Sequence, residues 1–123
     1  MGDADRSALE VQFRALYAAF NARDVGLLLA AMTPDVDWAN GMTGGRVHGR
    51  EAVRAYWAAQ WAEIDPRVEP VRITPDGRDG VAVDVHQVVR DRAGAVLADQ
   101  RVRHVYRLRD GLVARMDIEA VTE

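Results

Sequence analysis

The sequence predicts a single α+β domain over residues 1–123, with helices in the first half and an antiparallel sheet in the second. Two observations predict this class. Apolar residues recur every three or four positions over much of residues 5–64, which is the period of amphipathic helices. From residue 67 onward they alternate at every second position, and turn sequences separate the alternating stretches, as expected for paired strands. A chain of 123 residues has the size of one ordinary domain.

Three helices are expected in the first half. The first spans about residues 5–22, where apolar residues at spacings of three and four alternate with charged ones. Asp24 can cap a second, shorter helix whose inner face reaches Met32, and Thr33-Pro34 should stop it because proline disfavours helical geometry in the residue before it. The third helix is expected at about Arg50 to Ile64, and Asp65-Pro66 should end it.

Five strands are expected. A short strand from Asp35 to Asn40 lies between the second and third helices, with Val36, Trp38 and Asn40 facing inward. The other four are joined by short turns, so successive strands must be antiparallel. They cover Val68–Thr74, Val81–Arg90, Val96–Arg109 and Leu112–Ala120.

Strand alternation turns several polar groups inward. His104 and Tyr106 share an apolar face with Gln100, and Gln87 has the same orientation in the preceding strand. Histidine is the side chain most readily poised for proton transfer near neutral pH, so His104 is a candidate catalytic residue; the alternative is a hydrogen-bonded core histidine. Gln87 and Gln100 either orient a ligand or hydrogen-bond each other across the strands.

The segment from Met32 to Trp61 contains all three tryptophans, Trp38, Trp57 and Trp61, together with Tyr56. Large aromatic side chains bury much apolar area, so this cluster indicates either a corner of the core or the wall of a small-molecule pocket. The second interpretation predicts an apolar, cyclic ligand.

Composition argues against several function classes. The net charge is −3 and the sixteen positive residues, all arginine, are dispersed, so nucleic acid is not an expected partner. No apolar run approaches the roughly 18 residues of a membrane span and no signal pattern is visible, so a cytoplasmic protein without a membrane partner is expected. Cysteine is absent, and His48, His86 and His104 lack ligand spacing, so no metal or other cofactor is expected.

The order of elements resembles the nuclear transport factor 2-like (NTF2-like) superfamily and, within it, the SnoaL-like branch. Four segments carry the resemblance: LYAAFNARD (16–24), MTPDVDW (32–38), VHGREAVRAYW (47–57) and HVYRLRDGLVARMDI (104–118). The resemblance implies a cone-shaped barrel in which three N-terminal helices pack in a strongly curved mixed, mainly antiparallel sheet. It also implies a pocket at the open end and a homodimer formed through the outer face of the sheet.

The resemblance is carried over residue by residue. Asn40 stands where ketosteroid isomerases have their general-base carboxylate, and an amide cannot accept a proton at neutral pH. Leu16 stands nearest their oxyanion-side tyrosine, with Tyr17 expected on the wrong side, so steroid isomerisation is not expected. Asp117 matches the acid/base aspartate of SnoaL-like polyketide cyclases. Strand alternation turns Asp117 away from the pocket if Met116 enters it, and a bulge in this strand would swap such assignments.

Together these features predict a protein that binds a small apolar organic molecule in a hydrophobic pocket, with cofactor-free acid/base isomerase, cyclase or hydratase chemistry. The catalytic candidates are His104 and Asp117. The substrate-binding candidates are Trp38, Asn40, Tyr56, Trp57, Trp61, Gln87, Gln100, Tyr106 and Met116. The alternative is a non-catalytic ligand-binding or dimerisation module of the same fold, which the missing carboxylate at Asn40 favours.

Overall fold

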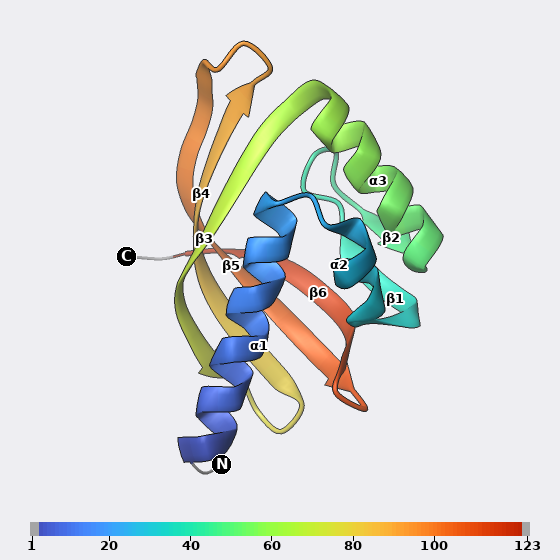
Figure 1. Cartoon of the computed structure of the whole chain (residues 1–123), viewed down its shortest axis with the longest axis vertical. Coiled ribbons are helices and arrows are strands. Elements are labelled where there is room, and N and C mark those ends of the chain that lie inside the picture. The colour runs from blue at the N-terminus through green and yellow to red at the C-terminus, as the bar shows by residue number, and fades with distance from the viewer. Residues whose placement is uncertain (1–2, 122–123) are drawn as a thin grey trace.

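The computed structural model describes residues 3–121, with side chains from residue 6 onward. Helices and strands follow one another in the predicted order, with one additional short strand before the third helix (Figure 1). The helices are α1 (Asp3–Asn21), α2 (Val25–Ala30) and α3 (Arg50–Glu63). The strands are β1 (Met32–Ala39), β2 (Arg46–His48), β3 (Ile64–Pro75), β4 (Gly80–Asp91), β5 (Val96–Arg109) and β6 (Leu112–Ala120).

The six strands form one curled sheet in the order β2-β1-β6-β5-β4-β3. Strands β1 and β6 run parallel, and every other neighbouring pair is antiparallel. Helix α1 lies against the concave side of the sheet. Helix α3 lies away from α1, on the side of β1 and β2 (Figure 1). The predicted α+β fold, a curved mixed sheet holding N-terminal helices, is therefore confirmed. Strand β2 has only three residues, too few for alternation to predict it.

The second helix is shorter than predicted. Asp24 caps it as expected, since its carboxylate accepts a hydrogen bond from the Leu27 amide at 3.2 Å. The helix ends at Ala30, however, and Met32 begins β1. Thr33-Pro34 does more than stop a helix, because the extended geometry that proline favours in the preceding residue also suits a strand. The side chain of Met32 is buried as expected, but Met32 is part of the strand and not of the helix.

Strand β3 begins at Ile64, directly after α3, and not at Val68 as predicted. The sequence contains Pro66, Pro70 and Pro75 in this stretch, which suggests a loop. Because β3 is an edge strand, one side of its backbone needs no partner, and proline is tolerated there. The same prolines leave the edge poorly suited to pairing with another strand.

Strand β6 contains a β-bulge, which changes the faces that simple alternation would give. Arg107 pairs with Arg115, but Leu108 pairs with Val113, so Ala114 is one extra residue on β6. Val113 and Met116 consequently both face the core, each 2% exposed. Uninterrupted alternation would put Val113 and Met116 on opposite faces of the strand, and the bulge is the reason that it does not hold here.

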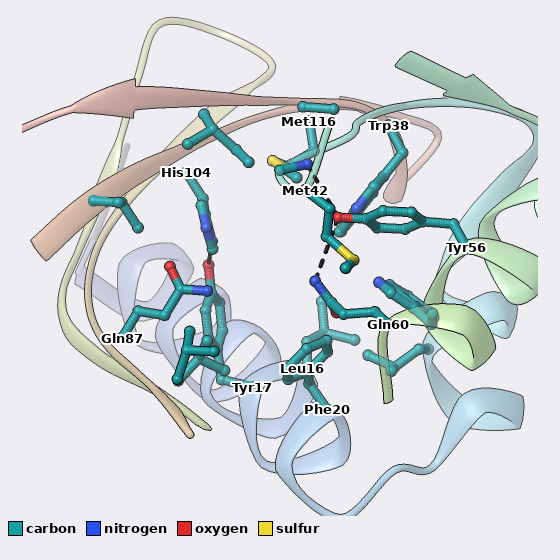
Figure 2. Close-up of a pocket in the computed structure, with 18 of the residues that line it drawn as sticks. Leu16, Tyr17, Phe20, Trp38, Met42, Tyr56, Gln60, Gln87, His104 and Met116 are labelled. Atoms are coloured by element: carbon teal, nitrogen blue, oxygen red, sulfur yellow. Dashed lines mark hydrogen bonds between the residues drawn. The ribbon is translucent and has the colours of Figure 1, made fainter. Parts of the chain in front are cut away.

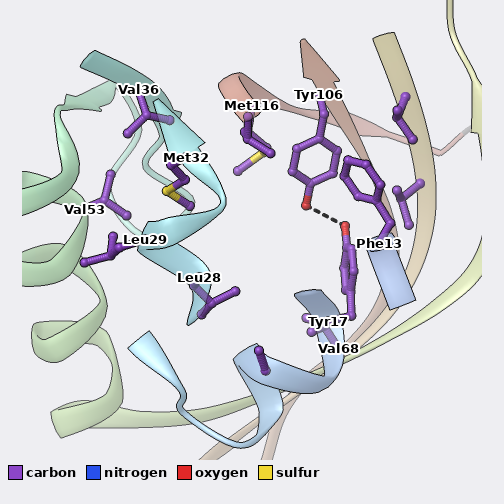
Figure 3. Packing of buried hydrophobic residues seen from close by; sticks show 14 of the residues in the cluster. Phe13, Tyr17, Leu28, Leu29, Met32, Val36, Val53, Val68, Tyr106 and Met116 are labelled. Atoms are coloured by element: carbon purple, nitrogen blue, oxygen red, sulfur yellow. Dashed lines mark hydrogen bonds between the residues drawn. The ribbon is translucent and has the colours of Figure 1, made fainter. Parts of the chain in front are cut away.

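The core fills the space between α1, α2, α3 and the concave face of the sheet (Figure 3). Phe13 from α1 is fully buried and its ring lies 4.9 Å from that of Tyr106. On the sheet, β4 contributes every second residue, namely Val81, Val83 and Val85. No helix in the described part of the chain is long and apolar enough to span a bilayer.

Candidate functional site

A cavity of about 440 Å³ opens between α1, α3 and the concave face of the sheet (Figure 2). This volume falls within the range of small-molecule pockets. The residues that line it come from all three helices and from every strand except β2, and none of those in the described part of the chain is Asp, Glu, Lys or Arg. The cavity is therefore built for an uncharged occupant, because a buried ion without a partner is strongly unfavourable.

Most of the wall is apolar and aromatic. Leu16 and Phe20 line it from α1, and Met116 lines it from β6. Trp38 and Trp57 both reach the cavity, and their rings meet edge to face at 5.4 Å. Flat aromatic walls of this kind suit a ring system, as the aromatic cluster in the sequence predicts.

Three polar side chains form a hydrogen-bonded chain along one wall. The hydroxyl of Tyr17 lies 2.7 Å from that of Tyr106 and 2.7 Å from Nδ1 of His104. Burial lowers the pKa of His104 to about 4, so its imidazole is neutral at neutral pH. Burial also raises the pKa of both tyrosines, so both keep their protons.

The direction of these hydrogen bonds follows from counting donors and acceptors. Tyr17 is the only hydrogen-bond partner of the Tyr106 hydroxyl among the described residues, so the arrangement that pairs both tyrosine protons within the protein has Tyr106 donating to Tyr17. Tyr17 then donates to Nδ1 of His104, which a neutral imidazole can accept. The remaining proton of His104 sits on Nε2, which has no partner among the described residues. This N–H is a hydrogen-bond donor available to a ligand in the cavity.

The opposite wall carries a second polar pair on α3. The hydroxyl of Tyr56 accepts hydrogen bonds from the Gly41 amide at 3.0 Å and from Nε2 of Gln60 at 3.4 Å. Gln60 is only 9% exposed and lines the cavity with Tyr56. Near His104, Gln100 donates to Gln87 across β4 and β5 at 3.4 Å, and both also line the cavity. The predicted hydrogen bond between these two glutamines is therefore present, and their role in orienting a ligand stays a prediction.

Two predicted binding residues do not line the cavity. Asn40 folds back on its own loop, where its side-chain oxygen accepts hydrogen bonds from the amides of Met42 and Thr43, both at 3.0 Å. The Trp61 ring stacks on the Trp57 ring with 5.9 Å between their centroids. The guanidinium carbon of Arg23 lies over the Trp61 ring, 5.0 Å from its centroid. The sequence placed both residues in the binding wall because of their type and segment, and the structure corrects this.

Asp117 also lies outside the cavity. It bonds to Arg46 at 2.8 Å and to Arg115 at 2.9 Å, and Arg115 holds the pKa of its carboxyl below the usual range. Asp37 pairs with the same two arginines, so the four side chains tie β2 and β1 to β6. The prediction that Asp117 acts in the cavity is therefore wrong, since its carboxylate forms ion pairs on the outer side of the sheet. Strand alternation had indicated this orientation, because the neighbouring Met116 faces the cavity.

The cavity includes residues that the sequence did not single out. Tyr17 was expected on the wrong side of α1, and this expectation is wrong, since both Leu16 and Tyr17 line the cavity. Gln60 lies one helical turn from Tyr56 and Trp57, so helical periodicity could have placed it on their face; its polar character hid it. Among the described residues, no three His, Asp or Glu side chains gather as metal ligands would.

The curled sheet and the enclosed apolar cavity define a barrel of the NTF2-like superfamily. A family model described as the SnoaL-like domain matches residues 13–116, and the chain belongs to that family. Comparison with curated proteins finds no match.

Solved structures agree with this fold. TerC, crystallised with polyporic acid, is 29% identical over 87% of this chain and 86% of its own, with a TM-score of 0.76. An NTF2-like protein of unknown function from Burkholderia pseudomallei is 28% identical over 89% and 87%, with a TM-score of 0.78. A Mycobacterium tuberculosis protein in complex with estradiol-17beta-hemisuccinate is 21% identical over 88% and 89%, with a TM-score of 0.74, a likeness of fold alone.

Proposed function

We propose that this protein binds a neutral, largely apolar small molecule in its cavity and that the Nε2–H of His104 donates a hydrogen bond to an oxygen of that molecule. The observation that carries this proposal is the polarised chain Tyr106–Tyr17–His104, which ends on an unpartnered donor in a cavity without charged side chains. A carbonyl oxygen is the natural acceptor for such a donor. Crystallisation of TerC with polyporic acid adds support for a ligand-binding role.

Acid/base catalysis as an isomerase, cyclase or hydratase is the second candidate. The hydrogen-bonded chain favours it, because a preorganised donor can stabilise a negative charge that develops on a carbonyl oxygen. Such a reaction also needs a base, and the lining contains no carboxylate. His104 would have to act as that base through Nε2 in its other tautomer, in which Nδ1–H donates to the Tyr17 hydroxyl. If His104 does not transfer a proton, the protein is a non-catalytic ligand-binding module.

The test compares three biphenyls that differ at one substituent, measured by calorimetric titration. We expect 4-acetylbiphenyl to bind several-fold more tightly than 4-ethylbiphenyl, because its carbonyl meets the His104 donor. We expect biphenyl-4-carboxylate to bind at least tenfold more weakly than the ketone, because no cation lines the cavity to pair with it. Equal or tighter binding of the carboxylate would sink the proposal.

We also propose that two copies of the chain associate through the outer face of the sheet. Ala82 and Val88, both only partly buried, lie on this face of β4, and the ion pair of Asp84 with Arg103 lies between them. Apolar residues among satisfied ion pairs suit a moderately polar interface. Light scattering at micromolar concentration should give about twice the chain mass of 13.6 kDa. A mass near 13.6 kDa would contradict the dimer.

A further inference from the structure

One wall of the cavity belongs to a loop. Apart from the C-cap residue of α2, the other lining residues lie in helices or strands. The loop, residues 40–45, joins β1 to β2 and contributes Gly41 and Met42 to the lining. Figure 2 shows the Met42 side chain beside Tyr56 and Gln60. Met42 is also 40% exposed, so it lies at the boundary between the cavity and the solvent.

The tip of this loop has open space around it. At Gly44 and Gly45 φ is positive, and a Cβ placed on either residue would meet no atom within 4 Å. The hydrogen bonds of the Asn40 side chain stay within the loop, so they keep its shape without tying it to the rest of the protein. The loop is tied to α3 by the hydrogen bond from the Gly41 amide to the Tyr56 hydroxyl, at 3.0 Å. A segment held by so few contacts opens at a low cost in free energy.

The two ends of the loop, in contrast, are held in the sheet. Arg46, the first residue of β2, donates to Asp117 at 2.8 Å and to the Met116 carbonyl at 2.7 Å, and it also pairs with Asp37. These bonds join β2 and β1 to β6. The segment between them can therefore move about fixed ends, which is the arrangement of a hinged loop.

From this arrangement we propose that the loop is a movable wall and that Met42 sets the length of the ligand that the cavity holds. This inference rests on the proposed function, because a ligand bound to His104 through its oxygen directs its far end past Trp38 toward Met42 (Figure 2). For a longer ligand the hydrogen bond between Gly41 and Tyr56 breaks and the loop swings outward. Met42 then leaves the cavity, and the ligand takes its place against Tyr56.

The chain contains no cysteine, so one engineered disulfide can hold the loop closed. A Cβ on Gly41 would lie 3.2 Å from Cδ1 of Ile118, which brings the thiols of the double variant Gly41→Cys/Ile118→Cys within bonding range. We expect the reduced variant to bind both 4-acetylbiphenyl and the longer 4-acetyl-p-terphenyl in calorimetric titrations. Oxidation, verified by a free-thiol assay, should weaken binding of the terphenyl about tenfold or more and change that of the biphenyl about twofold or less. Reductant should reverse both changes.

Met42→Ala tests the wall without a crosslink. Because most of the side chain is gone, the affinity for the terphenyl relative to the biphenyl should rise about fivefold or more. Leu27→Ala is the matched control, because Leu27 is 45% exposed on α2 and does not line the cavity. The relative affinity of this control for the two compounds should equal the wild-type value.

The outcomes separate the two proposals. If neither compound binds the wild-type chain, the proposed function fails. If the biphenyl binds but the terphenyl does not, the movable wall is overturned and the proposed function stands. The movable wall is equally overturned if oxidation of the double variant leaves the terphenyl affinity unchanged, or if Met42→Ala leaves the relative affinity at the wild-type value.

Discussion

Replacing His104 with phenylalanine should weaken binding of 4-acetylbiphenyl by roughly tenfold or more, while binding of 4-ethylbiphenyl changes little. Phenylalanine keeps the flat ring and most of the volume but removes the donor that faces the ligand carbonyl. It also removes the acceptor of the Tyr17 hydroxyl, which lies 2.7 Å from His104 Nδ1. The loss should therefore appear specifically for ligands that carry an oxygen at this end.

The matched control for this variant is His86→Phe. His86 bonds to Asp99 at 2.6 Å on the outer face of the sheet and does not line the cavity, so its replacement should leave the affinity for both biphenyls unchanged. Because burial lowers the pKa of His104 to about 4, its imidazole stays neutral and wild-type affinity should be the same at pH 6 and pH 8. Equal affinity of His104→Phe and the wild-type protein for 4-acetylbiphenyl would show that His104 does not donate a hydrogen bond to the ligand.

Replacing Phe13 with alanine should lower the free energy of unfolding by about 3–5 kcal/mol. The side chain is fully buried, and its ring packs against Tyr106 at 4.9 Å between α1 and the sheet. Alanine would lose this burial and leave a space that the surrounding strands can close only in part. Urea unfolding followed by tryptophan fluorescence measures the change.

Val11→Ala on the same helix is the control for Phe13→Ala. Val11 is 70% exposed, so its truncation should change the free energy of unfolding by no more than about 0.5 kcal/mol. Both substitutions introduce alanine into α1, so helix propensity cannot account for the difference between them. A loss below about 1 kcal/mol in Phe13→Ala would contradict the assignment of Phe13 to the core.

The fold could be predicted from the sequence because its two periodicities are separate along the chain. Helical spacing identifies α1 and α3, and alternation identifies β4 and β5 almost to their ends. The exceptions have local physical causes. The prolines of β3 suggested a loop, but they are tolerated in this strand because it lies at the edge of the sheet. Ala114 is an extra residue in β6, and a period of two cannot reveal where a residue has been inserted.

The cavity could be predicted in part, from the aromatic residues Trp38, Tyr56 and Trp57 and from alternation along the strands. Alternation along β5 correctly grouped Gln100, His104 and Tyr106, all of which line the cavity. Tyr17 and Gln60 join them from helices far away in sequence, and only the packing of α1 and α3 on the sheet brings them together.

Residue type misled where local hydrogen bonds or ion pairs decide orientation. Asn40 caps its own loop through two backbone amides. Asp117 is held by Arg46 and Arg115 on the outer side of the sheet. Neither arrangement can be read from the type of the residue or from its match to a family motif.

The most direct measurement of the central claim is a crystal structure of the protein with 4-acetylbiphenyl. We predict that the rings lie against Trp38 and Trp57 in the cavity and that the ketone oxygen sits roughly 3 Å from Nε2 of His104. A ligand bound with its oxygen away from His104, or bound only outside the cavity, would contradict the account.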